Sequence, residues 1–268
     1  MESFLSIDIL HSMGFKSVGD NVLISSKASF YGISQISLGS NVRIDDFCVL
    51  SAGQEGIRIG RNVHIGIMSS LIGADKIELE NFCTLSSRVA IYSSSDNFNG
   101  EYMISPTVPE KYTNVINGVV SLKKHVVIGS GTVILPGVTV GEGTAVGALS
   151  LISKDLEPFS IYAGNPIKLL KPTRSKRIFE LEKLYLDSEK FKKAIQMLPF
   201  FQNILSVYRL IGQSHGIFFN SQDTRQLEIR KLTFAKQSYW VITNEVAKEL
   251  CYRVILLHLT MNVKCDLK

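Results

Sequence analysis

The 268-residue sequence is poor in cysteine, in tryptophan and in long apolar runs. Its four cysteines form no CxxC pair and no ligand spacing, so we expect neither a disulfide framework nor a metal site. The longest apolar stretch, around Val254–Leu259, is far too short to span a membrane. The N-terminus lacks a basic segment followed by an apolar one, so we expect no signal peptide and a cytoplasmic location.

The charge pattern also argues against a nucleic-acid-binding protein. The net charge is +5, but the basic residues are scattered instead of covering one broad face. One denser run of basic residues indicates a binding site for a small polyanionic ligand. This run comprises Lys168, Lys171, Arg174, Lys176 and Arg177.

An aliphatic or aromatic residue recurs at every sixth position over more than a hundred residues, and in most cases a small or β-branched residue follows four places later. This period fits neither an α-helix nor the alternating strands of a β-sandwich. The leading residues are Val18, Ile24, Phe30, Leu38, Ile44, Leu50, Ile59, Ile65, Leu71, Leu79, Leu85, Ile91, Leu122, Ile128, Ile134, Val140, Val146 and Ile152. A Gly often follows the leading residue, where we expect tight corners with unusual dihedral angles.

Extra residues between leading positions occur only after every third repeat, so three short strands form one coil with insertions at a single corner. The spacing predicts a mainly β, parallel β-helix of about six coils, with a long excursion loop over 92–121 after Ile91. Stacked at about 4.8 Å per coil, six coils extend for roughly 29 Å. We expect an N-terminal cap over 1–17, the β-helix over 18–172 and a helical or mixed extension over 173–268. Within that extension, helical spacing predicts a helix over 175–198.

Residues 126–171 read VVIGSGTVILPGVTVGEGTAVGALSLISKDLEPFSIYAGNPIKLLK. This stretch resembles the C-terminal signature of hexapeptide-repeat acetyltransferases, and is similar to galactoside O-acetyltransferase and to the sugar acetyltransferases of O-antigen and capsule gene clusters. The resemblance covers roughly residues 18–175. It implies a left-handed β-helix, a homotrimer, acetyl-CoA as donor, and a coenzyme groove between subunits that the long loop of one subunit reaches.

The same resemblance implies which residues bind the coenzyme. Backbone amides at tight turns would hold the pantetheine arm, and lysines would neutralise the phosphates. The positions that match the family pattern are Ser130, Ala148, Ser153, Lys154, Lys168 and Lys171. Solvated surface residues are the alternative interpretation of the three lysines.

Acyl transfer requires a base for the acceptor's proton, which in the galactoside acetyltransferases is a histidine of the long loop. The loop here contains no histidine. Asp96 occupies roughly that place and is the first candidate, although a turn-forming role within residues 94–97 is an equal alternative. His64 is the second candidate, because we expect it to point outward, stacked between Arg43 and Thr84 of adjacent coils.

Four further residues are candidates for binding the acceptor: Asn97, Tyr102, Tyr112 and His125. An amine needs less help from a base than a hydroxyl does, so the missing histidine favours N-acetylation of a nucleotide-linked amino sugar for surface polysaccharide. O-acetylation of a saccharide stays open as an alternative. A non-catalytic β-helix scaffold is the alternative of another class, because one fold can serve several functions.

Overall fold

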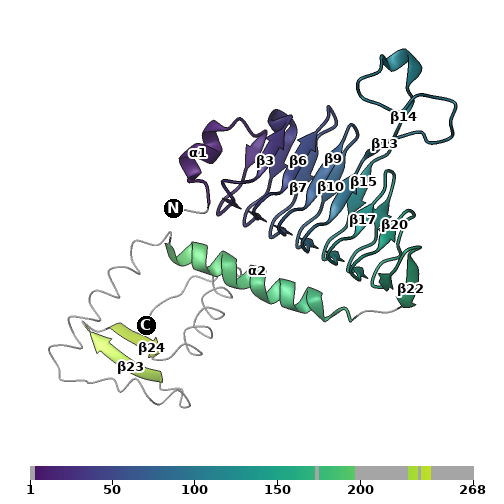
Figure 1. Ribbon diagram of the computed structural model, residues 1–268. Coiled ribbons are helices and arrows are strands. Elements are labelled where there is room, and N and C mark those ends of the chain that lie inside the picture. Colours follow the sequence, from purple (N-terminus) through teal and green to yellow (C-terminus); the bar gives the residue numbers. More distant parts are fainter. Residues whose placement is uncertain (1–3, 173–174, 197–228, 235–236, 243–268) are drawn as a thin grey trace. The chain divides into compact units, whose positions relative to one another are not determined.

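The computed structural model describes residues 4–172, 175–196, 229–234 and 237–242, and residues 17–171 wind into a β-solenoid (Figure 1). Three sheets form its sides, two with six strands and one with eight. Each turn of the chain contributes one short strand to each sheet, which gives six complete coils and a partial seventh that ends in β21 and β22. The predicted mainly β solenoid is confirmed.

The strands within each sheet are parallel except the last pair of the second sheet. The first sheet contains β1 (Ser17–Val18), β4 (Ile36–Leu38), β7 (Ile57–Ile59), β10 (Ile77–Leu79), β15 (Val120–Leu122) and β18 (Thr139–Val140). The second contains β2 (Leu23–Ile24), β5 (Arg43–Ile44), β8 (His64–Ile65), β11 (Thr84–Leu85), β16 (Val127–Ile128), β19 (Ala145–Val146), β21 (Ile161–Ala163) and β22 (Lys168–Lys171). The third contains β3 (Ser29–Tyr31), β6 (Val49–Ala52), β9 (Ser70–Gly73), β12 (Ala90–Tyr92), β17 (Val133–Ile134) and β20 (Leu151–Ile152).

The core runs along the inside of the coils and consists largely of the predicted repeat positions, with further buried residues such as Ile36, Ile57 and Ile77. Of the eighteen leading residues, all except Val18 and Phe30 are buried. Cys48 and Cys83, each four places after a leading residue, are also fully buried. Burial raises the pKa of the Cys83 thiol to about 12, so it stays protonated and acts as a small apolar side chain in the core. Cys251 and Cys265 lie outside the described residues.

Three corners join the sheets. The first corner connects the first sheet to the second, the second corner connects the second sheet to the third, and the third corner returns the chain to the first sheet of the next coil. The insertions, including the 92–121 loop, fall at the third corner as predicted. At the first corner Asn21, Asn41 and Asn62 adopt positive φ angles of 54°, 59° and 57°, a conformation that Asn tolerates better than most residues.

The predicted role of the repeat glycines is wrong. The glycines that follow leading residues do not have positive φ; at the corners, residues such as Asn41 and Phe47 do. These glycines are needed because backbones of stacked coils approach closely. A Cβ on Gly39 would lie 2.6 Å from the carbonyl carbon of Gly60.

The remaining elements precede or follow the solenoid in the sequence, or lie in its loops. Before β1, the short helix α1 (Ile7–Ser12) is capped by the Ser6 hydroxyl and buries Leu10. After the solenoid, α2 (Arg177–Gln196) confirms the predicted helix. Two short 3-10 helices, η1 (Ile33–Gln35) and η2 (Glu110–Tyr112), occupy loops at the third corner.

A second unit over residues 179–268 contains the antiparallel pair β23 (Ile229–Phe234) and β24 (Gln237–Ile242). Two apolar stretches of the C-terminal extension, residues 200–211 and most of 232–259, lie outside the described residues. Among the helices that the structure describes, none is long and apolar enough to cross a membrane.

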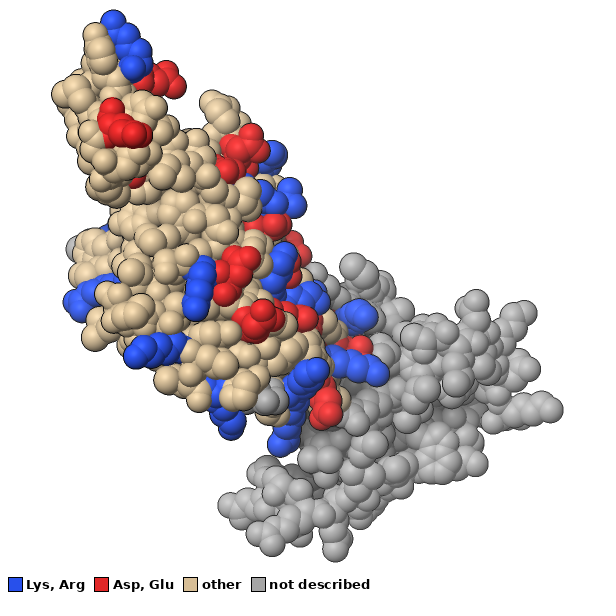
Figure 2. Space-filling view, turned by 90° about the vertical axis from the view of Figure 1, so that its right-hand side faces the viewer, with Lys and Arg blue, Asp and Glu red and all other residues tan. Residues whose placement is uncertain are grey.

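Charges of both signs are interspersed on the face of the molecule shown in Figure 2. Ion pairs join neighbouring coils, including Lys27 with Asp46 at 2.7 Å and Lys123 with Glu80 at 3.0 Å. On this face the basic side chains do not form the broad one-signed area that a nucleic-acid footprint requires.

Candidate active site

The excursion loop carries a small hairpin that projects beyond the stacked coils (Figure 1). Its strands are β13 (Ser94–Asp96) and β14 (Val115–Asn117), and Asp96 pairs with Val115 in antiparallel register. The hairpin is extended by a hydrogen bond from the Asn97 amide to the carbonyl of Asn114 at 3.0 Å. The loop is therefore built on strand pairing that fixes where Asp96 lies.

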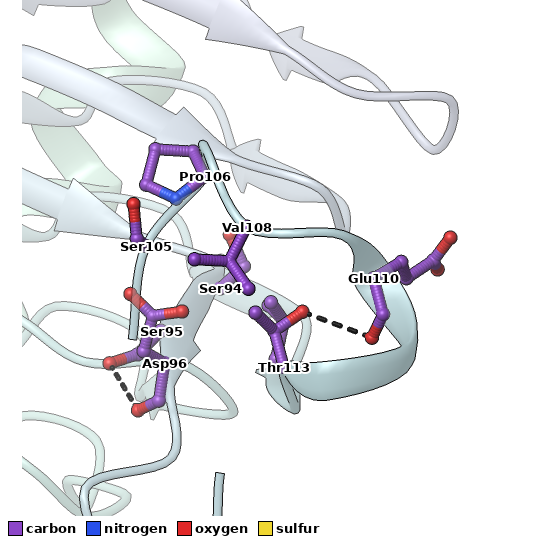
Figure 3. A pocket seen from close by; sticks show the side chains of 9 residues that line it. Ser94, Ser95, Asp96, Ser105, Pro106, Val108, Glu110 and Thr113 are labelled. Atoms are coloured by element: carbon purple, nitrogen blue, oxygen red, sulfur yellow. Dashed lines mark hydrogen bonds between the residues drawn. The ribbon is translucent and has the colours of Figure 1, made fainter. Parts of the chain in front are cut away.

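The hairpin strands and the segment that connects them line an open cavity of about 500 Å³ (Figure 3). In this view Ser95 and Asp96 lie on one side, Thr113 and Glu110 on the other, and Val108 between them. The full lining consists of Ser94, Ser95, Asp96, Ser105, Pro106, Val108, Glu110, Thr113 and Val115. The cavity falls in the size range of small-molecule sites.

In the structure Asp96 does not form the turn that its neighbours in the sequence suggest. Asp96 is a strand residue, half-buried, and lines the cavity. The Asx turn is made instead by Asn97, whose Oδ1 accepts a hydrogen bond from the Asn99 amide at 3.0 Å. Asp96 is thus placed where a substrate could reach it, and Asn97 serves the local backbone.

The two loop tyrosines lie outside the residues that line the cavity. Tyr102 is 43% exposed and Tyr112 is 51% exposed, and the Lys111 ammonium lies 4.7 Å from the centroid of the Tyr112 ring. Their exposed faces are available for stacking, although the structure does not bring them to Asp96.

His64 lies on the outer face of the second sheet, stacked between Arg43 and Thr84 as predicted. Its Nε2 is 2.7 Å from the Asp45 Oδ2, and the Arg43 Nε is 2.7 Å from the Asp45 Oδ1. Burial raises the pKa of the Asp45 carboxyl, but hydrogen bonds from Arg43 and His64 outweigh it and hold this pKa below the ordinary value of 3.8. Asp45 is therefore ionised, and its carboxylate orients the His64 ring.

The second corner brings together part of the predicted coenzyme set. Ser130 and Ala148 occupy the same position on adjacent coils, and the Leu149 amide donates to the Ser130 carbonyl at 2.8 Å. A Cβ on Gly129 would lie 2.4 Å from the Ala148 nitrogen, so the backbones of the two coils are in close contact, and Ser130 and Ala148 are both exposed. Ser86 lies at the same corner one coil earlier, its amide bonded to the Ile128 carbonyl at 2.9 Å.

The other predicted coenzyme residues lie elsewhere. Ser153 and Lys154 follow β20 and belong to the third corner, at the other end of that strand from the second corner. Lys168 and Lys171 are exposed at the two ends of β22, on the edge of the second sheet. A single chain therefore presents the predicted coenzyme residues at two corners of the prism and at the edge of the second sheet.

His125 does not lie near the cavity. It occupies the first corner with a φ of 59°, and its ring stacks on Phe82 with 5.0 Å between centroids and an interplanar angle of 11°. Stacking along this corner accounts for its position. Across the described part of the chain, no group of three or more His, Cys, Asp or Glu residues could hold a metal ion.

Comparison with known proteins connects this geometry to an enzyme family. No family model matches the chain. It is 51% identical over 179 residues to the dTDP-4-amino-4,6-dideoxy-D-glucose acyltransferase of Escherichia coli, which covers 67% of this chain and 93% of that protein.

Solved structures of the N-acyltransferase AntD from Bacillus cereus are also similar. AntD in complex with dTDP and 3-hydroxybutyryl-CoA is 46% identical with a TM-score of 0.68, covering 71% of this chain and 100% of AntD. A serine variant of AntD binds dTDP-4-amino-4,6-dideoxyglucose and coenzyme A, with 46% identity, a TM-score of 0.67 and coverage of 70% and 99%. In a further variant an aspartate ten positions after that serine is replaced.

The six-residue repeat, the β-solenoid and this level of sequence identity all indicate the same family. The chain belongs to the family of hexapeptide-repeat β-helix acyltransferases.

Proposed function

We propose that this protein transfers an acyl group from acyl-CoA to the 4-amino group of dTDP-4-amino-4,6-dideoxyglucose. The main support is the 51% sequence identity to an Escherichia coli acyltransferase of that acceptor, over 93% of the length of that enzyme. The AntD complexes with the same nucleotide sugar and with acyl-CoA support both substrates. N-acylation of a nucleotide-linked amino sugar is also what the missing loop histidine favours.

In the proposed reaction, the amine nitrogen attacks the thioester carbonyl carbon, and the tetrahedral intermediate expels the coenzyme A thiolate. The ammonium loses one proton before attack and the attacking nitrogen loses a second afterwards, and we assign Asp96 to accept this second proton and pass it to the departing thiolate. Asp96 suits this role because it lines the loop cavity from a paired strand. His64, oriented by Asp45, is the alternative base.

A spacing in AntD supports Asp96 and adds a residue that the sequence does not reveal by itself. The serine and aspartate replaced in AntD are ten positions apart. Ser86 and Asp96 share that separation, and no other aspartate of this chain follows a serine at that distance. We assign the Ser86 hydroxyl to the reacting carbonyl as a hydrogen-bond donor, because it lies at the second corner, one coil before Ser130.

For the donor, we propose that the second-corner amides near Ser130 and Ala148 hold the pantetheine arm. Ser153, Lys154, Lys168 and Lys171 would then contact the phosphates from a neighbouring subunit or from the sheet edge. Acetyl-CoA is the donor that we expect from the sequence. AntD binds 3-hydroxybutyryl-CoA, so a donor with this longer acyl group should be compared with acetyl-CoA.

The wider setting follows from these assignments. We propose a homotrimer, a role in supplying acylated sugars for surface polysaccharide such as O-antigen, and a cytoplasmic location where nucleotide sugars are made. Asn97, Tyr102, Tyr112 and His125 stay candidates for contacts to the acceptor, with Asn97 and His125 the weaker pair because the structure gives both a local structural role.

The function is tested by incubating the purified full-length chain with acetyl-CoA or 3-hydroxybutyryl-CoA and dTDP-4-amino-4,6-dideoxyglucose. Release of the coenzyme A thiol and a mass increase of the nucleotide sugar would support the proposal. The matched control acceptor is the same nucleotide sugar with a 4-hydroxyl, which tests O-acylation. Binding of coenzyme A without transfer to either acceptor would contradict the proposed acceptor, and no binding at millimolar coenzyme would favour a scaffold.

A further inference from the structure

We infer that the loop cavity seats the hexose ring of the acceptor and selects for a 6-deoxy sugar by placing Val115 beside Asp96. This inference rests on the proposed function and names the part of the substrate that the cavity recognises. Three features of the cavity support it: its charge, its apolar wall, and the relative position of the two groups.

The cavity lining is suited to a cationic sugar and not to a phosphate. Asp96 and Glu110 contribute carboxylates, four hydroxyl side chains contribute donors and acceptors, and no Lys or Arg lines the cavity. An amino group, which is protonated in water near neutral pH, is favoured in such a site, and sugar hydroxyls can pair with the serines and Thr113. The diphosphate of a nucleotide sugar would be repelled, so only the sugar end belongs there.

Apolar groups form the rest of the lining: Pro106, Val108 and Val115. Val115 is 46% exposed, so part of its surface is open to a ligand. A hexose with a 6-hydroxyl would leave that polar group facing methyl groups, whereas a 6-methyl group would bury apolar surface against them.

The hairpin register places these two kinds of group side by side. Asp96 and Val115 are directly opposite each other in the β13–β14 pair. Side chains of such a pair project from the same face with Cβ atoms about 5 Å apart. In a 4-amino-4,6-dideoxyhexose the amine is attached to C4 and the C6 methyl group to C5, which are adjacent ring atoms. A sugar whose amine faces Asp96 therefore presents its C6 to Val115.

The test compares two acceptors, dTDP-4-amino-4,6-dideoxyglucose and its counterpart with a 6-hydroxyl, in Val115→Thr and in the native protein. Threonine has nearly the shape of valine and replaces one methyl group by a hydroxyl. Val119→Thr is the matched control, since Val119 is equally exposed at 45%, belongs to the same loop and does not line the cavity. The measured quantity is the ratio of kcat/KM for the two acceptors.

We expect the native protein to prefer the 6-deoxy acceptor by about 10- to 100-fold, the range that an apolar pocket achieves against an added hydroxyl. Val115→Thr should reduce this preference by at least about fivefold, and Val119→Thr should leave it unchanged. Unchanged affinities for dTDP and coenzyme A in both variants would verify intact folding. Val108→Thr, at another apolar residue that lines the cavity, provides a second variant should Val115→Thr fail to fold.

Three results would overturn the inference. These are a native protein without preference between the acceptors, an unchanged preference in Val115→Thr and Val108→Thr, or an equal change in Val119→Thr. Each of them is compatible with acyl transfer and leaves the proposed function intact. Absence of transfer to both acceptors by the native protein would instead refute the proposed function and this inference with it.

Discussion

Asp96 is the residue on which the proposed chemistry depends most directly. Replacing it by asparagine keeps the strand pairing with Val115 but removes the proton acceptor. We expect Asp96→Asn to lower turnover at least about tenfold, equivalent to about 1.4 kcal/mol of transition-state stabilisation, with little change in coenzyme affinity. Steady-state kinetics and calorimetric titration with coenzyme A measure the two quantities.

Glu101→Gln is a suitable control for this experiment, because it makes the same chemical change in the same loop. Glu101 is exposed, does not line the cavity and accepts a hydrogen bond from the Asn99 side chain at 2.6 Å. Its replacement should leave turnover near the native value. Native turnover in Asp96→Asn would exclude Asp96 as the base and direct attention to His64.

Asp45 should make stability depend on pH in an acidic window. Its pKa in the folded protein is below the ordinary 3.8, so its ionised form stabilises the fold above that value, and this contribution is lost as the pH falls through the folded-state pKa. Asp45→Asn should therefore have a lower Tm than the native protein near neutral pH, and the difference should shrink toward pH 3 and below.

Thermal unfolding of both proteins across this pH range measures the effect. Asp8→Asn, an exposed acid-to-amide change in α1, serves as the control. A Tm difference for Asp45→Asn that stays constant with pH would mean that the carboxylate charge is not what stabilises the contact with Arg43 and His64.

At the scale of elements, the repeat determined most of what could be predicted. A six-residue period needs only local sequence, and it located the sheets, the buried positions and the insertion corner. The hairpin inside the excursion loop could not be predicted in this way, because Asp96 and Val115 are brought together by pairing between segments that carry no repeat. Its cavity was missed for the same reason.

The same limit applies to the site residues. The outward position of His64 follows from the register, whereas its contact with Asp45 depends on the side-chain conformation at a corner. Ser86 was missed because nothing in the local sequence distinguishes it from the other serines at the corners. Aligning the second-corner residues coil by coil would have placed it in one column with Gly129 and Gly147, next to the predicted coenzyme residues Ser130 and Ala148.

The close approach of coils predicts different outcomes for two glycine substitutions. In Gly39→Ala the new Cβ would lie 2.6 Å from the backbone of Gly60, so neighbouring coils must separate, at a cost of about 3 kcal/mol or more. Gly137 has a φ of 81°, and a Cβ added there would meet no atom within 4 Å, so Gly137→Ala incurs only backbone strain of about 1 kcal/mol. Chemical denaturation should rank the variants in this order, and equal stabilities would contradict the packing argument.

At the scale of the whole molecule, the separation of the predicted coenzyme residues is the main reason to expect an oligomer. The loop with Asp96 and the residue Lys154 both belong to the third corner, while Ser130 and Ala148 belong to the second. A rigid prism cannot bring its own corners together. Packing copies side by side can, and a closed ring of three gives three equivalent sites.

Mixing two defective variants tests whether each site is shared. We expect Asp96→Asn to have lost the base and Ser86→Ala to have lost the hydrogen bond to the reacting carbonyl, so the activity of each variant is low. If Asp96 of the third corner and Ser86 of the second corner reach one site from different subunits, refolding the two variants together at equal concentration restores both native residues in about one site in four, since each is present with a probability of one half. Activity should then rise to about a quarter of the native value after mixing. Activity that stays at the mean of the two variants would show instead that both residues serve the same subunit's site or that the chains do not assemble.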